Sequence, residues 1–297
     1  MSNVIACPVD RELVEERRVV TLAALLSLYM IWGSTYYAMR VALETLPPFL
    51  MAGPRFVLAG AVMYAWLRSR GASAPSRAQW VASAKVSVLL LVVGNGAIAI
   101  AQRGSVSSST SAVVVASMPI WAAVFARGFG VRSSGREWIG LLLGFAGVVL
   151  LRLGGALRFD GPAIVLLAAP IAWAFGSVWM KKLPLPEGIM ASATQMITGG
   201  AAMLLLAAAT GERLVAVPST RSLLAVAYLM VFGSIVGFTA YNWLLRNVRP
   251  ALATSYAYVN PIVALAIGAW LGGEPVGLLT VGAAAVSLLG VALISRA

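Results

Sequence analysis

Long apolar runs separated by short polar breaks dominate the chain. Most of them have the ~20 residues that a helix needs to cross the hydrocarbon core of a bilayer. The fifth run is shorter, since only fourteen residues separate Glu137 from Arg152, and it also fits a buried helix. Lipid offers no partner for free backbone groups, so each run is predicted to be helical. The ten predicted spans are residues 19–39, 48–67, 80–101, 106–126, 138–151, 162–180, 188–210, 222–245, 251–271 and 276–295.

Composition supports a membrane location. The chain has 297 residues, of which 60% are hydrophobic and 11% are charged, whereas a soluble domain has about 25% charged residues. Such a chain cannot bury its apolar side chains in a soluble fold, so its expected solvent is the lipid bilayer. The connections between runs are short, which leaves no room for a domain outside the membrane. The oligomeric state is open, and a monomer fits.

The net charge of +12 could indicate nucleic-acid binding, but its distribution favours a topology instead. With a cytoplasmic N-terminus, fourteen Lys and Arg residues lie on the inner side and six on the outer side. Arg55 and Lys85, inside spans, complete the 22. Positive residues concentrate in cytoplasmic loops. We therefore expect a multi-pass protein of the bacterial inner membrane with both termini in the cytoplasm and no nucleic-acid partner.

The two halves of the chain resemble each other. Three landmarks of the first, fourth and fifth spans recur in the same order in the sixth, ninth and tenth. The pairs are Trp32 and Trp173, Pro119 and Pro261, and Gly147 and Gly290, at offsets of 141, 142 and 143 residues. We predict a cytoplasmic tail at residues 1–18 and two five-helix repeats at 19–152 and 162–295. Because five is odd, the second repeat enters the membrane from the opposite side and is inverted.

The paired prolines suggest a function for this symmetry. Proline in a helix interior removes a hydrogen bond and bends the helix. Inverted repeats with interrupted helices at matching positions are typical of transporters whose site lies near the membrane midplane. Pro119 and Pro261 are therefore predicted kinks beside a central cavity. The alternative is a tolerated bend, since membrane helices carry more proline than soluble ones.

Three motifs carry a family resemblance. These are "WGSTYYA" in the first span, "PPFLMAGPRF" at the second and "NPIVALAIGAWLGGEP" in the ninth. Their order resembles that of the EamA-type permeases of the drug/metabolite transporter superfamily. The resemblance implies an all-α membrane protein of ten helices in two inverted repeats that exports small metabolites. Within the family, the chain is most similar to exporters of aromatic amino acids.

Aromatic and amide side chains near the middle of the spans are the candidate substrate-binding residues. Together they would line an apolar cavity with a few uncharged polar groups, which suits a small amphipathic ligand. Two alternatives remain, because Asn can bond across helices as a packing contact and Trp or Tyr can anchor span ends. The candidates are Trp32, Asn95, Trp121, Trp173, Tyr241, Tyr256 and Asn260.

Three further polar residues lie within spans. Arg55 would either pair a substrate carboxylate or form a structural contact, and the sequence slightly favours the structural role. Lys85 is close enough to a span end to extend toward the cytoplasm. Gln102 lies seven residues after Asn95, but near the outer end of its span, which makes it a weaker candidate.

Missing residue types limit the function. The chain has no histidine, and neither a phosphate-binding loop nor a nucleophile-elbow motif occurs. We therefore expect no enzymatic activity, no cofactor and no metal site. None of the ten acidic residues lies in mid-span, so a facilitator is expected rather than a proton antiporter. The alternatives are a proton-coupled multidrug or metabolite exporter and a non-transporting receptor or assembly factor.

Overall fold

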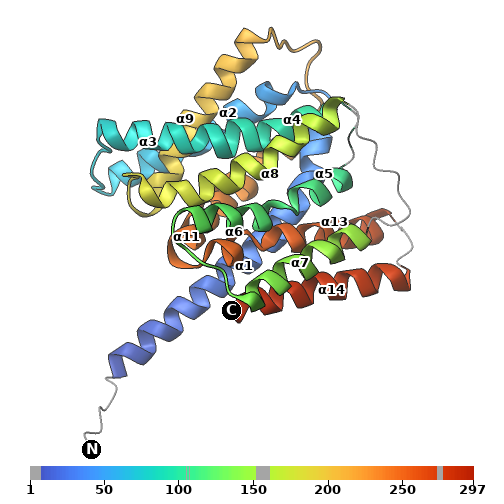
Figure 1. Cartoon of the computed structure of the whole chain (residues 1–297). Helices are drawn as coiled ribbons and strands as arrows, with labels where there is room; N and C mark the ends of the chain where they lie inside the picture. Colours follow the sequence, from blue (N-terminus) through green and yellow to red (C-terminus); the bar gives the residue numbers. More distant parts are fainter. Residues whose placement is uncertain (1–7, 105, 107, 152–160, 273–276) are drawn as a thin grey trace, which may run out of the picture.

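Every element that the structure describes is a helix (Figure 1). The computed structural model describes residues 8–104, 106, 108–151, 161–272 and 277–297. The first half comprises α1 (Pro8–Ala42), α2 (Pro48–Ser69), α3 (Arg77–Ser87), η1 (Val88–Asn95), α4 (Gly96–Arg103), α5 (Ser108–Val115), α6 (Met118–Gly128) and α7 (Gly135–Leu150). The second comprises α8 (Gly161–Trp179), η2 (Met180–Lys182), α9 (Gly188–Ala209), α10 (Thr220–Tyr228), η3 (Leu229–Phe238), α11 (Thr239–Asn247), α12 (Pro250–Thr254), α13 (Tyr256–Gly272) and α14 (Leu278–Ser295).

The predicted spans are found as long apolar helices. Nine stretches of the described residues are long and apolar enough to cross a membrane. The fifth prediction corresponds to α7, a helix of 16 residues that falls below that length. Helix α7 instead packs along α14 (Figure 1). The all-helical membrane fold is confirmed, and ten is an approximate count of its spans.

The helices of the two halves correspond. The third span, α3–η1–α4, and the eighth, α10–η3–α11, each carry a π-helical segment in the middle. Helix α2 packs along its counterpart α9, and α7 packs along its counterpart α14. The members of the α7/α14 pair run in opposite directions in Figure 1. Contact between equivalent helices is what a twofold axis between inverted halves produces.

Glycines allow the α7/α14 contact to be close. A Cβ placed on Gly147 would lie 2.4 Å from the Ser287 nitrogen, and one on Gly290 would lie 2.4 Å from the Gly144 nitrogen. Real side chains cannot occupy such positions. Small residues let membrane helices approach each other to backbone contact, and here they join the last helix of one repeat to that of the other.

The two prolines are not placed alike. Pro119 occupies the first turn of α6, after an interruption at residues 116–117. A proline is tolerated there because the first N–H groups of a helix have no intrahelical acceptor. Pro261 lies inside α13, which follows an interruption at Ser255. Only Pro261 therefore occupies the helix-interior position that was expected of both.

Helix α1 is longer than the predicted first span. It begins at Pro8 and continues without interruption to Ala42, so part of the predicted tail at residues 1–18 is helical. The segment is rich in Glu and Arg, which favour helix. Its beginning projects from the bundle in Figure 1. Cys7 and Glu274 lie outside the described residues.

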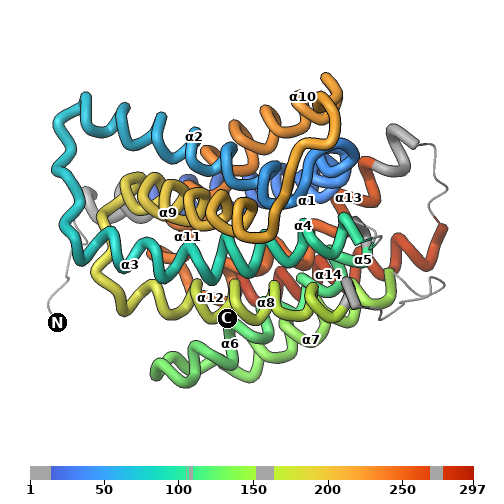
Figure 2. The backbone as a smooth tube through the Cα atoms, turned by 90° about the horizontal axis from the view of Figure 1, so that it is seen from above, coloured from blue at the N-terminus to red at the C-terminus, as the bar shows by residue number. Residues whose placement is uncertain are grey.

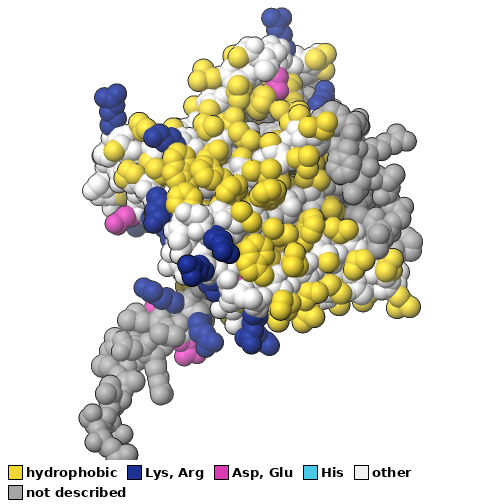
Figure 3. All heavy atoms as spheres, in the orientation of Figure 1, with side chains coloured by type: hydrophobic (Ala, Val, Ile, Leu, Met, Phe, Trp, Pro, Cys, Tyr) yellow, Lys and Arg dark blue, Asp and Glu magenta, His cyan; other side chains and the backbone are white. Residues whose placement is uncertain are grey.

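We define two ends of the bundle by the connections between helices. The terminal face carries the C-terminus and connections 70–76, 129–134 and 183–187, and the opposite face carries connections 43–47 and 210–219. Figure 3 shows hydrophobic side chains over much of the body, with most visible Lys and Arg toward the side from which α1 projects. Leu26 and Leu205 are among the large hydrophobic side chains that are exposed on the bundle. Figure 2 gives the view from above.

Candidate functional site

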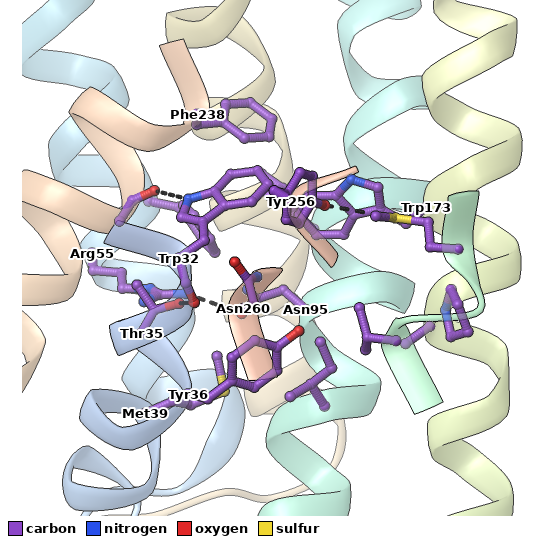
Figure 4. A pocket seen from close by; sticks show the side chains of 18 residues that line it. Trp32, Thr35, Tyr36, Met39, Arg55, Asn95, Trp173, Phe238, Tyr256 and Asn260 are labelled. Carbon is purple, nitrogen blue, oxygen red and sulfur yellow. Dashed lines mark hydrogen bonds between the residues drawn. The ribbon is translucent and has the colours of Figure 1, made fainter. Parts of the chain in front are cut away.

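A cavity lies between the two halves (Figure 4). About 680 Å³ of empty space lies within it, and this volume includes space that is open to solvent. Both repeats contribute to its wall. The lining residues are Trp32, Thr35, Tyr36, Met39, Arg55, Phe56, Leu91, Asn95, Ile98, Val115, Met118, Ala169, Pro170, Trp173, Gly233, Phe238, Tyr256 and Asn260.

Four rings gather at one end of this cavity and form what we call the ring cluster: Trp32, Trp173, Tyr241 and Tyr256. The Trp32 ring centroid lies 4.7 Å from that of Tyr256, 5.1 Å from Tyr241 and 5.6 Å from Trp173. Edge-to-face ring pairs contribute about 0.5–1.5 kcal/mol each beyond the area they bury. The cluster therefore joins four helical segments, α1 of the first half and α8, α11 and α13 of the second.

The ring cluster lies toward the terminal face. Helices α1 and α13 both run from the terminal face toward the opposite face. Trp32 is therefore nearer the terminal face than Tyr36 and Met39 on α1, and Tyr256 is nearer it than Asn260 on α13. Figure 4 shows the same order, with the rings at one level and Tyr36 and Met39 at the other end.

Hydrogen bonds fix the ring orientations. The Trp32 Nε1 donates to the Gly233 carbonyl at 3.0 Å, and the Tyr256 hydroxyl donates to the Met118 sulfur at 3.6 Å. The Tyr241 hydroxyl pairs with Ser177 at 2.6 Å. Tyr241 is fully buried and does not line the cavity, so it supports the other rings from behind.

Glycines of the π-helical segments give the indoles their space. A Cβ on Gly237 would come within 2.3 Å of Trp32 Nε1, and one on Gly94 within 2.5 Å of the Trp173 ring. Gly237 belongs to η3 and Gly94 to η1. Each half thus supplies the glycine against which the tryptophan of the other half packs. π-Helical turns occur frequently at functional sites.

Polar groups form a second layer beside the rings. Arg55 Nη2 donates to Asn95 Oδ1 at 3.0 Å. The Asn260 side chain is buried, and neither of its amide atoms has a hydrogen-bond partner among the described residues, although the Tyr36 hydroxyl lies near it. Trp173 Nε1 is also buried without a partner. Most buried polar groups in proteins have a hydrogen-bond partner. The donors and acceptors of this layer that have no described partner could therefore bind a ligand.

The structure brings five of the seven predicted residues to the cavity wall: Trp32, Asn95, Trp173, Tyr256 and Asn260. Tyr241 lies directly behind them. Trp121 does not reach the cavity, because its side chain is 36% exposed on the bundle surface and stacks on Phe125. Gln102 is also absent from the wall, and its amide atoms are buried without partners.

Sequence reasoning missed part of the wall. The sequence left the role of Arg55 open with a slight preference for a structural contact, and its side chain lines the cavity and is 3% exposed. Its charge inside a span was the available clue. Thr35, Tyr36 and Met39 follow Trp32 along α1, and their helical spacing of three to four residues could have identified them. Phe238 had no distinguishing feature in the sequence.

Acidic groups of the described residues that form contacts lie near the membrane faces. Glu137 pairs with Arg249 at 2.6 Å, and Glu44 lies 3.8 Å from Arg221. Glu212 accepts from the backbone nitrogens of Phe49 and Leu50 at the start of α2. None of these carboxylates lines the cavity, and neither does the exposed Lys85.

Comparison with known proteins gives a consistent picture. The model of the EamA-like transporter family matches residues 19–153 and 161–296. The chain is 46% identical over 252 residues to the uncharacterized inner membrane transporter YedA of Escherichia coli K12, covering 84% of this chain and 82% of that one. It is 24% identical to the uncharacterized transporter YoaV of Bacillus subtilis, with 85% and 88% covered. A solved crystal structure matches with a TM-score of 0.74 at 19% identity, covering 94% of this chain and 96% of that one, which shows a shared fold.

Proposed function

Because this chain belongs to the EamA-like transporter family, we propose that its central cavity carries small amphipathic metabolites across the bacterial inner membrane, with aromatic or large neutral amino acids as substrates. The observation that carries the proposal is the composition of the cavity wall. Rings of both repeats meet there beside the unpaired amide of Asn260. The overall resemblance of the sequence to the aromatic amino-acid exporter YddG also supports this substrate class.

The layered wall suits such a ligand. An aromatic or branched side chain would pack against Trp32, Trp173 and Tyr256. The polar end of the ligand would then lie beside Asn95 and Asn260, whose amides can donate and accept hydrogen bonds. Apolar pockets with a few placed polar groups bind ligands in one orientation.

Alternating exposure of this cavity is the proposed mechanism. The ring cluster would be the barrier toward the terminal face in one state, and inverted repeats allow the equivalent closure toward the opposite face in the other. The interruptions at residues 116–117 and Ser255, together with Pro261, would be the points at which the helices bend. We propose a facilitator, since the carboxylates that contact described residues lie away from the cavity.

Counterflow in liposomes tests the function. Purified protein is reconstituted with unlabelled L-phenylalanine inside and a trace of radiolabelled L-phenylalanine outside, without any ion gradient. We expect labelled substrate to accumulate transiently, and Trp173→Leu to reduce that accumulation. Trp121→Leu is the matched control, because Trp121 lies outside the cavity. The proposal fails if accumulation equals that of protein-free liposomes for every aromatic and large neutral amino acid.

A further inference from the structure

Arg55 is a buried cation in the cavity wall. It follows Pro54 in α2, with a side chain that is 3% exposed and therefore does not extend to a membrane face. Its guanidinium carbon lies 4.4 Å from the centre of the Phe56 ring, and its Nη2 donates to Asn95 Oδ1 at 3.0 Å. These contacts hold the guanidinium in place, and both partners are uncharged.

The charge of Arg55 has no counter-ion in the described part of the chain. No described carboxylate lies within ion-pair distance of it, since the two ion pairs found involve Arg221 and Arg249. A guanidinium has five N–H donors and keeps its proton in proteins. One of these donors has a hydrogen bond to a described residue, and Nε is buried without an acceptor.

A purely structural role explains this arrangement poorly. A bond between α2 and η1 could be made by two amides, without the large desolvation cost of a buried ion. Buried charges are normally paired. An arginine beside an open cavity, with unused donors, has the chemistry of a receptor for an anion that is not part of the chain.

The surroundings limit which anion fits. Figure 4 shows Arg55, Asn95 and Asn260 in one layer, next to the level of Trp32, Tyr256 and Trp173. A ligand that touches both layers needs a compact anionic group attached to an apolar or aromatic part. The planar fork of arginine matches a carboxylate, which it can bind through two parallel hydrogen bonds. No described carboxylate lines the cavity, so the described part of the wall offers an ammonium group no oppositely charged partner.

We propose that Arg55 binds the carboxylate of the transported molecule, and that small aromatic monocarboxylates are recognised whether or not they carry an amino group. Asn95 positions the guanidinium, and the ring cluster receives the apolar part. This inference rests on the proposed function and specifies the chemical group by which its substrates are recognised. Aromatic amines that lack a carboxylate should not bind.

Competition in the counterflow assay tests the proposal. Uptake of labelled L-phenylalanine is measured with excess 3-phenylpropionate, which lacks the amino group, or phenethylamine, which lacks the carboxylate. We expect 3-phenylpropionate to inhibit and phenethylamine to have no effect. Equal inhibition by both, or inhibition by phenethylamine alone, would overturn the role of Arg55 while leaving transport intact.

A binding measurement covers the case in which L-phenylalanine is not transported. Trp32 and Trp173 line the cavity, so tryptophan fluorescence of the purified protein should report occupancy by the same three compounds. Quenching by 3-phenylpropionate but not by phenethylamine would support the inference even if the proposed amino-acid substrates fail. Quenching by phenethylamine at the same concentration, or by none of the three, would refute it.

Variants locate the effect. Arg55→Gln should weaken inhibition by 3-phenylpropionate about 10- to 100-fold, as expected for loss of a hydrogen bond to a charged group, and Arg55→Lys should lie between this variant and the unaltered protein. Arg40→Gln, which removes an exposed arginine from the last turn of α1, should behave like the unaltered protein. Unchanged inhibition in Arg55→Gln would contradict the proposal.

Discussion

The indole of Trp32 lies directly against Gly237, so closely that a Cβ on this glycine would be 2.3 Å from Nε1. Trp173 and Gly94 form the equivalent contact in the other direction, at 2.5 Å. The tryptophan of each half thus packs on the π-helical segment of the other. The position of each ring in the cavity wall depends on the absence of a side chain in the opposite repeat.

Replacing Gly237 with alanine should therefore displace Trp32. Overpacking of a close contact costs about 1–3 kcal/mol, and we expect lower thermal stability in detergent together with at least several-fold slower counterflow. Gly282→Ala is the control, because nothing lies within 4 Å of a Cβ at that position. Full activity of Gly237→Ala would show that the Trp32 position is not needed for transport.

The two cavity amides should respond differently to substitution by leucine. Asn95→Leu removes the acceptor of Arg55 and should lower stability by about 1–3 kcal/mol, because a buried donor loses its partner. Asn260→Leu removes a group without a described partner and should leave thermal stability unchanged or higher. Both should reduce transport. Asn247→Leu is the exposed control, and unchanged transport in both cavity variants would remove these amides from the site.

Transport should not require a proton gradient. We expect L-phenylalanine to leave loaded liposomes down its own gradient at equal pH on both sides, since histidine is absent from the sequence and the carboxylates in described contacts lie away from the cavity. Flux that occurs only under an imposed pH gradient would contradict this expectation. Lys85 and Glu274, the latter outside the described residues, would then be the first residues to substitute.

The partly buried ion pair between Glu137 and Arg249 at the terminal face should stabilise the fold. The Glu137 side chain is 3% exposed and Arg249 is 39% exposed, and the two groups lie 2.6 Å apart. Removing one partner of a buried pair costs about 3–5 kcal/mol, and partial exposure of Arg249 reduces this to about 2 kcal/mol. Arg249→Met should lower the unfolding temperature, and adding Glu137→Gln should restore part of it. Equal stability of all three forms would show that the pair contributes nothing.

Membrane orientation can be tested by cysteine labelling. In a Cys7→Ser background, Ser73→Cys and Ser133→Cys should react with a membrane-impermeant thiol reagent only from the cytoplasm. Val215→Cys, at a position that is 97% exposed on the opposite face, should react only from outside. The Lys and Arg distribution predicts this result. Labelling of Ser73→Cys in intact cells would refute it.

The sequence alone determined the helical membrane fold and its internal repeat. Apolar runs of membrane length permit one structure in lipid, because backbone groups there must bond within each helix. The offsets that relate Trp32 to Trp173 and Gly147 to Gly290 are separations along the sequence, which do not depend on the fold. The sequence alone therefore indicated the repeat. The mid-span positions of Tyr256 and Asn260 made both residues candidates for the cavity wall, where the structure places them.

Tertiary structure decided which side chains share a space. Trp121 and Trp32 are alike as residues within a span, but the rotation of α6 directs Trp121 to the surface while α1 directs Trp32 inward. Local pattern cannot fix that rotation in a helix that is apolar on every side, because lipid and protein core favour the same residues. For the same reason the sequence could not decide the role of Arg55. Whether a cation inside a span lies beside a carboxylate, a membrane face or an open cavity depends on helices that are distant in sequence. Here those helices place Arg55 beside Asn95 in the cavity wall.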